Sequence, residues 1–194
     1  MWSAISDLGD AAMTLPLAVA CCAWLAMSLS GWRAALAWLT PLCAGMLMVG
    51  LTKILYAGCG LQIPAIGFRV ISGHTMLASA VWPMAFLLAS RSGTSTDTRA
   101  ALMLGFLLAA LIGIARVFDQ AHTTSEVIAG WALGAVVTVI FVRWQAAPVL
   151  PSRLRPFAIV SMLVVSAAAY GHHAPIQAAI ESYSPILCER LFSV

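Results

Sequence analysis

Charged side chains are scarce in this sequence: Lys, Arg, Asp and Glu make up 9% of its 194 residues, whereas 62% are hydrophobic. Soluble globular domains carry about 25% charged residues, so this scarcity excludes a water-soluble protein. The high hydrophobicity excludes a disordered chain. The ten basic residues are scattered among apolar runs, which excludes a nucleic-acid-binding face. The composition indicates a single membrane-embedded domain over residues 1–194, built from helices.

Acidic residues number only seven. A two-metal hydrolase needs several carboxylates close together, so this shortage argues against such a site. Basic residues are also missing before the first apolar run, and Arg33 follows it. A cleavable signal peptide begins with a positively charged segment. We therefore expect the first run to remain in the protein as a membrane anchor.

Six apolar stretches approach the roughly 20 residues that a helix needs to cross a membrane. They cover about residues 13–30, 34–52, 73–90, 100–115, 125–142 and 157–171. Arg and Lys side chains at their ends lengthen the shorter stretches by reaching toward the lipid headgroups. The sequence predicts an all-α, polytopic membrane protein whose six transmembrane helices form one bundle.

Basic residues concentrate in the loops on one side of this predicted bundle. These loops contain six arginines and one acid, namely Arg33, Arg91, Arg99, Arg143, Arg153, Arg155 and Asp97. The positive-inside rule makes this side cytoplasmic. Both termini then lie on the outer face, which is periplasmic for a multi-pass protein of a bacterial inner membrane.

Polar side chains from four predicted helix ends gather at the outer face. They are Lys53 at the end of the second helix, Ser72, Gly73 and His74 at the start of the third, Arg116 at the end of the fourth, and His122 and Glu126 at the start of the fifth. Ionisable groups within membrane segments are costly and point to function. The topology alone therefore predicts a functional site at one depth of the outer leaflet.

The cations of this group suit a phosphate or diphosphate. Lys53 supplies a point charge and Arg116 a planar fork, and Arg69 in the intervening loop adds a third cation. The start of the third predicted helix adds free N–H groups. Gly73 permits a ligand to approach the backbone closely there. These features together predict an anion-binding site.

The histidines add the groups that phosphoryl transfer needs. His122 and Glu126 are four residues apart and share one helix face, so the carboxylate can bind one imidazole nitrogen and leave the other basic. His74 can then protonate a leaving oxygen. This set predicts phosphoryl transfer without a metal or cofactor. A zinc site of His74, His122 and Glu126 is the alternative by ligand type, but it leaves the cations without a role.

The segment Arg116–Glu126 also resembles a family signature. It is similar to the third signature of the type 2 phosphatidate phosphatases, S-R-x5-H-x3-D. Residues 72–74, Ser-Gly-His, are similar to the second signature, P-S-G-H, and Lys53 stands where the Lys of the first, K-x6-R-P, would stand. The resemblance covers about residues 50–135, which are the four central helices.

This resemblance implies the fold and mechanism that lipid phosphate phosphatases share with vanadium haloperoxidases, without a cofactor. His122 would attack phosphorus and form a phosphohistidine, Glu126 would orient it, and His74 would protonate the leaving group. Water would then hydrolyse the intermediate. The residues implied to hold the phosphate oxygens are Lys53, Ser72, Gly73 and Arg116.

Five positions depart from the signatures. Gly60 stands where the first signature has Arg, and no Pro follows it; Ile71 replaces Pro, and Ala115 replaces Ser. Glu126 replaces Asp, so its carboxylate reaches one methylene further. Arg69 is a candidate for the missing cation on the basis of its charge alone. These departures bear on the substrate and the rate more than on the class of reaction.

We expect a membrane phosphatase that acts on a lipid at the outer face, because cations at headgroup depth let the lipid tail stay in the bilayer. Candidate substrates are a polyprenyl diphosphate such as undecaprenyl diphosphate, a phosphatidate-type lipid and phosphorylated lipid A. A phosphotransferase with the same first half-reaction is one alternative. A non-catalytic lipid-phosphate binder or transporter is the other, since Pro16, Pro41 and Pro83 interrupt predicted helices.

Two residue pairs carry further hypotheses. Gly130 and Gly134 form a small-xxx-small pattern, which packs helices within one bundle or between the two chains of a homodimer. Cys59 and Cys188 both fall on the outer side, where oxidation is permitted. A disulfide there would tie the C-terminal segment to the loop beside Lys53.

Overall fold

The computed structural model describes residues 2–90, 94–145 and 150–192, so Arg91 lies outside the described residues. Over these ranges the chain forms helices, with short 3-10 turns η1 (Asp7–Gly9) and η2 (Pro64–Ile66). The helices are α1 (Trp2–Ser6), α2 (Ala11–Ala26), α3 (Gly31–Cys59), α4 (Gly73–Ala89), α5 (Ser95–Phe118), α6 (Thr124–Trp144), α7 (Arg155–Ala169) and α8 (Ile176–Phe192). The expectation of an all-α protein is confirmed.

Helices α2 to α7 correspond in order to the six predicted stretches. Of the described helices, α3, α5 and α6 are long and apolar enough to cross a membrane, and α1, η1 and α2 form a fourth candidate across a bend of 42°. Helices α4 and α7 are apolar but shorter, at 17 and 15 residues. The number of membrane crossings, six in our expectation, therefore stays a prediction.

Two predicted helix ends were wrong. Helix α2 ends at Ala26 rather than near residue 30, and the hydroxyl of Ser28 bonds to the carbonyl of Leu25 just beyond it. Helix α3 continues past Lys53 to Cys59 and ends where Gly60 adopts a left-handed conformation, with φ of 67°. A charged side chain ends an apolar run but not a helix, whereas glycine in this conformation does end one.

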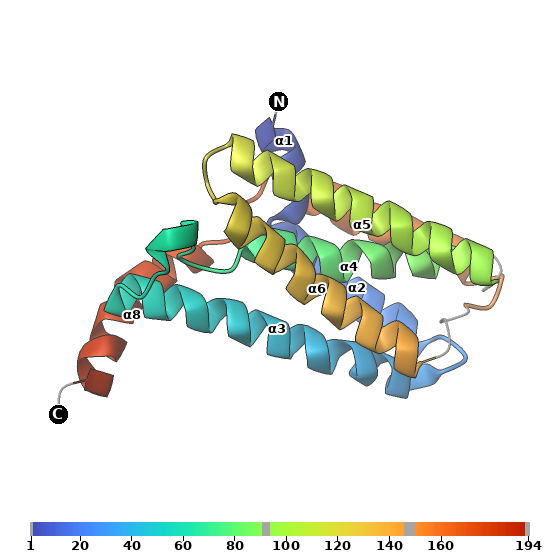
Figure 1. Ribbon diagram of the computed structural model, residues 1–194. Coiled ribbons are helices and arrows are strands. Elements are labelled where there is room, and N and C mark those ends of the chain that lie inside the picture. The colour runs from blue at the N-terminus through green and yellow to red at the C-terminus, as the bar shows by residue number, and fades with distance from the viewer. Residues whose placement is uncertain (1, 91–93, 146–149, 193–194) are drawn as a thin grey trace.

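Helix α4 lies at the centre of the bundle (Figure 1), packed against α2, α3, α5, α6 and α7. Most of its residues are buried. The two small residues of α6 face it, because a Cβ added to Gly130 would meet the carbonyl of Ser72 and one added to Gly134 would meet the carbonyl of Met76. The small-xxx-small pattern thus packs α6 against α4 within one chain. It therefore does not support the predicted homodimer, which stays a prediction.

Large apolar side chains remain exposed along the outer helices. Those at least half exposed include Leu47 on α3, Met103 and Leu107 on α5, Val136 on α6 and Leu163 on α7. Soluble monomers rarely expose apolar surface on this scale. The distribution is typical of a bundle that faces lipid.

The four helix ends that were predicted to converge do lie together. Figure 1 shows the C-terminal ends of α3 and α5 and the N-terminal ends of α4 and α6 at one end of the bundle. The C-terminal ends of α2 and α4 and the N-terminal ends of α3 and α5 lie at the opposite end. The candidate site residues therefore come from one end of the molecule.

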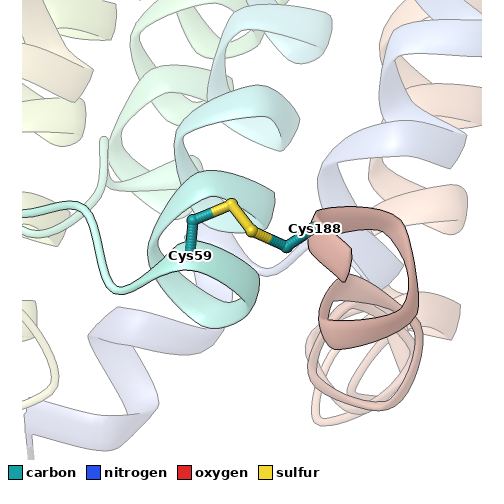
Figure 2. The surroundings of a disulfide bond; sticks show 2 residues. All are labelled: Cys59 and Cys188. Carbon is teal, nitrogen blue, oxygen red and sulfur yellow. A yellow bond between two sulfur atoms is a disulfide. The ribbon is translucent and has the colours of Figure 1, made fainter. Parts of the chain in front are cut away.

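The hypothesised disulfide between Cys59 and Cys188 is confirmed (Figure 2), with Cα atoms 5.7 Å apart. It joins the end of α3 to α8. The two helices pack closely beside it, because a Cβ added to Gly58 would meet the carbonyl of Ser184 and lie 3.1 Å from the Cβ of Cys188. Helix α8 is thereby fastened beside the site.

Candidate active site

The turn between α5 and α6 brings His122 back to Arg116. Gln120 adopts a left-handed conformation with φ of 56°. The N–H of Gln120 bonds to the carbonyl of Val117 at 3.0 Å, and that of Ala121 to the carbonyl of Arg116 at 3.1 Å. This is the Schellman pattern that ends helices. The N–H of His122 also reaches the carbonyl of Arg116, at 3.3 Å, so backbone bonds fix the spacing of the two side chains.

A capping box then starts α6. The hydroxyl of Thr123 accepts from the N–H of Glu126, and Glu126 Oε2 accepts from the N–H of Thr123 at 3.1 Å. The same Oε2 lies 2.8 Å from His122 Nδ1. An ionised carboxylate only accepts hydrogen bonds, so Nδ1 carries the hydrogen and Nε2 has a free lone pair. The predicted pairing of Glu126 with His122 is therefore present in the structure.

The second oxygen of Glu126 holds the loop before α4. Oε1 accepts from the backbone N–H of Arg69 at 3.0 Å, from its Nε at 3.1 Å and from the N–H of Val70 at 3.4 Å. Glu126 is fully buried, and its carboxylate thus has a donor on each side. The structure places Arg69 against this carboxylate; a contact of Arg69 with phosphate stays a prediction.

Lys53 lies over the first turn of α4, as its place in the sequence predicted. A Cβ added to Gly73 would lie 4.0 Å from Lys53 Nζ, so the bare backbone of Gly73 faces the ammonium group. Lys53 Nζ also donates to Gln177 Oε1 of α8 at 2.8 Å. Ser72 is fully buried, and its hydroxyl bonds to that of Thr75 at 3.0 Å. Its predicted contact with phosphate remains a prediction.

Arg116 reaches the N-terminal segment and keeps one donor available. Its Nη1 donates to the hydroxyl of Ser6 at 3.0 Å. Its Nε is buried and has no hydrogen-bond partner among the residues that the structure describes. Buried donors are nearly always paired, so this atom is available for an anion that enters the site.

Asp10 was not among the predicted site residues. Its Oδ2 lies 3.3 Å from His74 Nε2 and 3.4 Å from His173 Nδ1. The sequence places Asp10 before an apolar run, where it caps α2 by accepting the N–H of Ala12 at 2.8 Å. That position signals an N-cap, but no motif or spacing links it to His74.

The same cations act on both imidazoles. The charges of Arg116 and Lys53 reach both His74 and His122. Burial lowers the pKa of His122 to about 4; the hydrogen bond that His122 donates to Glu126 opposes this shift, and the Arg116 charge adds to it. His122 is therefore neutral at neutral pH, which is the form that acts as a nucleophile or base.

Two comparisons with known proteins found a match. The family model described as PAP2 superfamily matches residues 56–149. A Klebsiella pneumoniae protein, described as an uncharacterized 22.5 kDa protein in the cps region, is 35% identical over 146 residues, which are 74% of this chain and 69% of that protein. The chain belongs to the PAP2 superfamily. PAP2 proteins are generally phosphatases, and the resemblance found in residues 72–74 and 116–126 is confirmed. No solved structure matches the chain.

A cavity of about 150 Å³ opens beside the polar groups of this PAP2 chain, between α2, α3, α4 and the start of α8. Its lining is polar at one end, with Asp10, Lys53, His74 and Gln177. The rest is mainly apolar and includes Leu15, Met46, Val49, Met76, Leu77 and Ile180. The cavity therefore suits a molecule with an anionic head and an apolar tail.

Among the described residues, no set of ligands supports the alternative of a zinc site. Within residues 2–90, 94–145 and 150–192, no group of three or more His, Cys, Asp or Glu side chains is arranged to hold a metal ion. Glu126 binds His122 on one oxygen and Arg69 on the other. The side chains of this PAP2 site are arranged as imidazole–carboxylate pairs beside cations.

Proposed function

We propose that this protein is an integral membrane phosphatase that removes a phosphoryl group from a lipid phosphate or diphosphate through a phosphohistidine. The observation that carries the proposal is the 2.8 Å contact between Glu126 Oε2 and His122 Nδ1. It leaves Nε2 basic within reach of the charge of Arg116, whose buried Nε has no hydrogen-bond partner among the described residues. A positioned nucleophile with a cation for the transferred group is what phosphoryl transfer requires.

The proposed reaction has two steps. In the first, His122 Nε2 forms a bond to phosphorus, the bond from phosphorus to the lipid-side oxygen breaks, and His74 gives that oxygen a proton. In the second, the oxygen of a water molecule forms a bond to phosphorus, the bond from phosphorus to His122 Nε2 breaks and returns its electron pair to the imidazole, His74 takes a proton from the water, and inorganic phosphate leaves. Lys53, Arg116 and the first turn of α4 would stabilise the charge that develops on the phosphoryl oxygens.

A lipid substrate is supported by the cavity beside His74. Lys53 and His74 line its polar end, and Leu15, Met46 and Met76 line its apolar part. A headgroup phosphate can therefore meet the cations while its tail remains among apolar side chains. A polyprenyl diphosphate, a phosphatidate-type lipid and phosphorylated lipid A all fit this description.

The orientation of the site is part of the proposal. Arg33 and Arg99 lie at the starts of α3 and α5, next to the predicted cytoplasmic loops, and these two helix starts lie at the end of the bundle opposite the site. The positive-inside rule places such loops in the cytoplasm. We therefore propose that the site opens on the outer, periplasmic face of the inner membrane.

Phosphate release from lipid phosphates tests the proposal. The purified protein is expected to release phosphate from at least one member of a panel of mono- and diphosphate lipids, with inhibition by vanadate and no loss in EDTA. His122→Ala should abolish release, whereas His172→Ala, at an exposed histidine of the same end, should retain it. Transfer of the phosphoryl group to a second lipid would instead indicate a phosphotransferase. Wild-type inactivity on every lipid class would favour a non-catalytic binder or transporter.

A further inference from the structure

A second carboxylate–imidazole pair lies beside the cations of the site. Asp10 is buried, with 6% of its surface exposed, and its Oδ2 is 3.3 Å from His74 Nε2. The turn η1 packs directly on His74, because a Cβ added to Gly9 would lie 3.3 Å from the Cβ of His74. The backbone thus holds Asp10 against this imidazole.

We propose that Asp10 is a positioning residue that orients His74 and stabilises its protonated form for proton donation to the leaving oxygen. The inference rests on the proposed function, in which His74 is the acid. Asp10 binds one imidazole nitrogen, Nε2, so the other, Nδ1, is the nitrogen that transfers the proton. Glu126 does the opposite for His122, where it holds Nδ1 and leaves Nε2 to attack phosphorus.

The charges around His74 explain why it needs a carboxylate of its own. Lys53 and Arg116 both act on its imidazole, and nearby positive charge disfavours the imidazolium form that an acid requires. Glu126 is engaged with His122 and Arg69. Among the residues that the structure describes, Asp10 is the carboxylate within ion-pair distance of His74. The titratable groups at the site end of the surrounding elements include Asp7, Asp10, Lys53, Arg69, Arg116, Asp119, His122, Glu126 and His173.

The remaining contacts of Asp10 permit a selective substitution. Oδ1 accepts the N–H groups of Ala12 at 2.8 Å and Ala174 at 3.1 Å. Asn at this position keeps that oxygen, and with it the cap of α2 and the bond to the segment before α8. It replaces only Oδ2, the oxygen that faces His74 and His173. Asp10→Asn therefore removes the charge and leaves the local fold supported.

The first test compares leaving groups. An alkyl phosphate lipid needs a proton on its leaving oxygen, whereas a nitrophenyl phosphate ester does not. We expect Asp10→Asn to lower kcat/KM, which reports the leaving-group step, about 10- to 100-fold on the alkyl lipid and less than about threefold on the aryl ester. The basic limb of the pH profile on the alkyl lipid should also move to lower pH. The double variant with His74→Ala should be no slower than His74→Ala alone.

Asp7→Asn is the matched control, because it removes a carboxylate from the same segment that is not paired with His74; since Asp7 acts on Arg116, any change in rate should be the same on the two substrates. A merely structural role of Asp10 predicts equal losses on the two substrates, and that result would overturn the proposal. Wild-type protein that releases phosphate from neither substrate would overturn the proposed function, and with it any role of Asp10 in catalysis.

The second test does not depend on activity. With labelled histidine, the NMR titration of His74 should have a midpoint about one pH unit lower in Asp10→Asn than in the wild type. His74→Ala identifies the signal among the four histidines. An unchanged midpoint would overturn the proposal even in an active phosphatase, so failure of this inference can be distinguished from failure of the proposed function.

Discussion

Replacing Glu126 by Gln should break the contacts by which this carboxylate holds His122 on one side and Arg69 on the other. The carboxylate accepts from His122 and Thr123 on one oxygen and from Arg69 and Val70 on the other. A glutamine side chain has one acceptor oxygen and one donor nitrogen. Whichever way the amide turns, its NH2 group faces donors on one side.

The expected loss follows from these contacts. Each buried donor left without an acceptor costs about 1–3 kcal/mol, and a bond to a charged partner is worth more than a neutral one. Removing one partner of a buried pair typically costs about 3–5 kcal/mol, which we expect for Glu126→Gln. If the amide NH2 faces His122, the imidazole satisfies it by moving its hydrogen from Nδ1 to Nε2, the nitrogen that attacks. The comparable tautomer change in serine proteases lowers kcat about 10⁴-fold.

Thermal unfolding and phosphate release measure the two effects on one preparation. Glu126→Asp keeps the charge and introduces the residue of the family signature, but its side chain is one methylene shorter, so we expect stability and activity between those of wild type and Glu126→Gln. Asp119→Asn, at an exposed acid of the same turn, should change the free energy of unfolding by less than about 0.5 kcal/mol. Near-wild-type unfolding and phosphate release by Glu126→Gln would refute the reasoning.

Three further predictions concern the scaffold and the nucleophile. Replacing Cys59 and Cys188 together by Ser should lower the free energy of unfolding by about 2–4 kcal/mol, because the disulfide closes a sequence separation of 129 residues; an unchanged denaturation midpoint would contradict this. Gly134→Ala should cost about 1–3 kcal/mol, since its Cβ would meet the backbone of α4, whereas Gly50→Ala, with no atom within 4 Å of the added Cβ, should be neutral or stabilising by up to about 1 kcal/mol; equal unfolding midpoints would argue against close packing of α6 on α4. His122 should bind its proton only as the pH falls toward about 4, so its neutral form persists from pH 8 down to about 5; an NMR midpoint near the ordinary value of 6.5 would contradict the burial seen here.

Local patterns in the sequence predicted the parts of the site that local rules control. His122 and Glu126 are four residues apart on either side of a helix start, and the capping box fixes their contact. Lys53 and Gly73 met as predicted, because the topology sends the end of α3 and the start of α4 to one end of the bundle.

Contacts between distant segments could not be predicted in the same way. Arg69 was recognised as a cation, but its contact with Glu126 depends on the turn that Ile63 and Phe68 close by backbone bonds. The hydroxyls of Thr123 and Ser125 then hold that turn against the start of α6. The sequence shows that Arg69 is charged, but its pairing with Glu126 depends on tertiary packing.

Asp10 shows the same limit more clearly. Its capping role is a local property that the sequence before α2 indicates. Its contact with His74 arises only because η1 packs on the first turn of α4. The predicted end of α3, at Lys53, was wrong for a different reason. The apolar pattern indicates which side chains face lipid, whereas the helix ends where the backbone at Gly60 leaves the helical conformation.

Trapping the phosphoryl-enzyme tests the central claim most directly. Wild-type protein mixed with a lipid phosphate labelled in the phosphoryl group and quenched within one turnover should carry the label on His122, in an acid-labile bond. His122→Asn should carry none. Label that persists in His122→Asn, or phosphate release by the wild type without any labelled His122, would contradict the account.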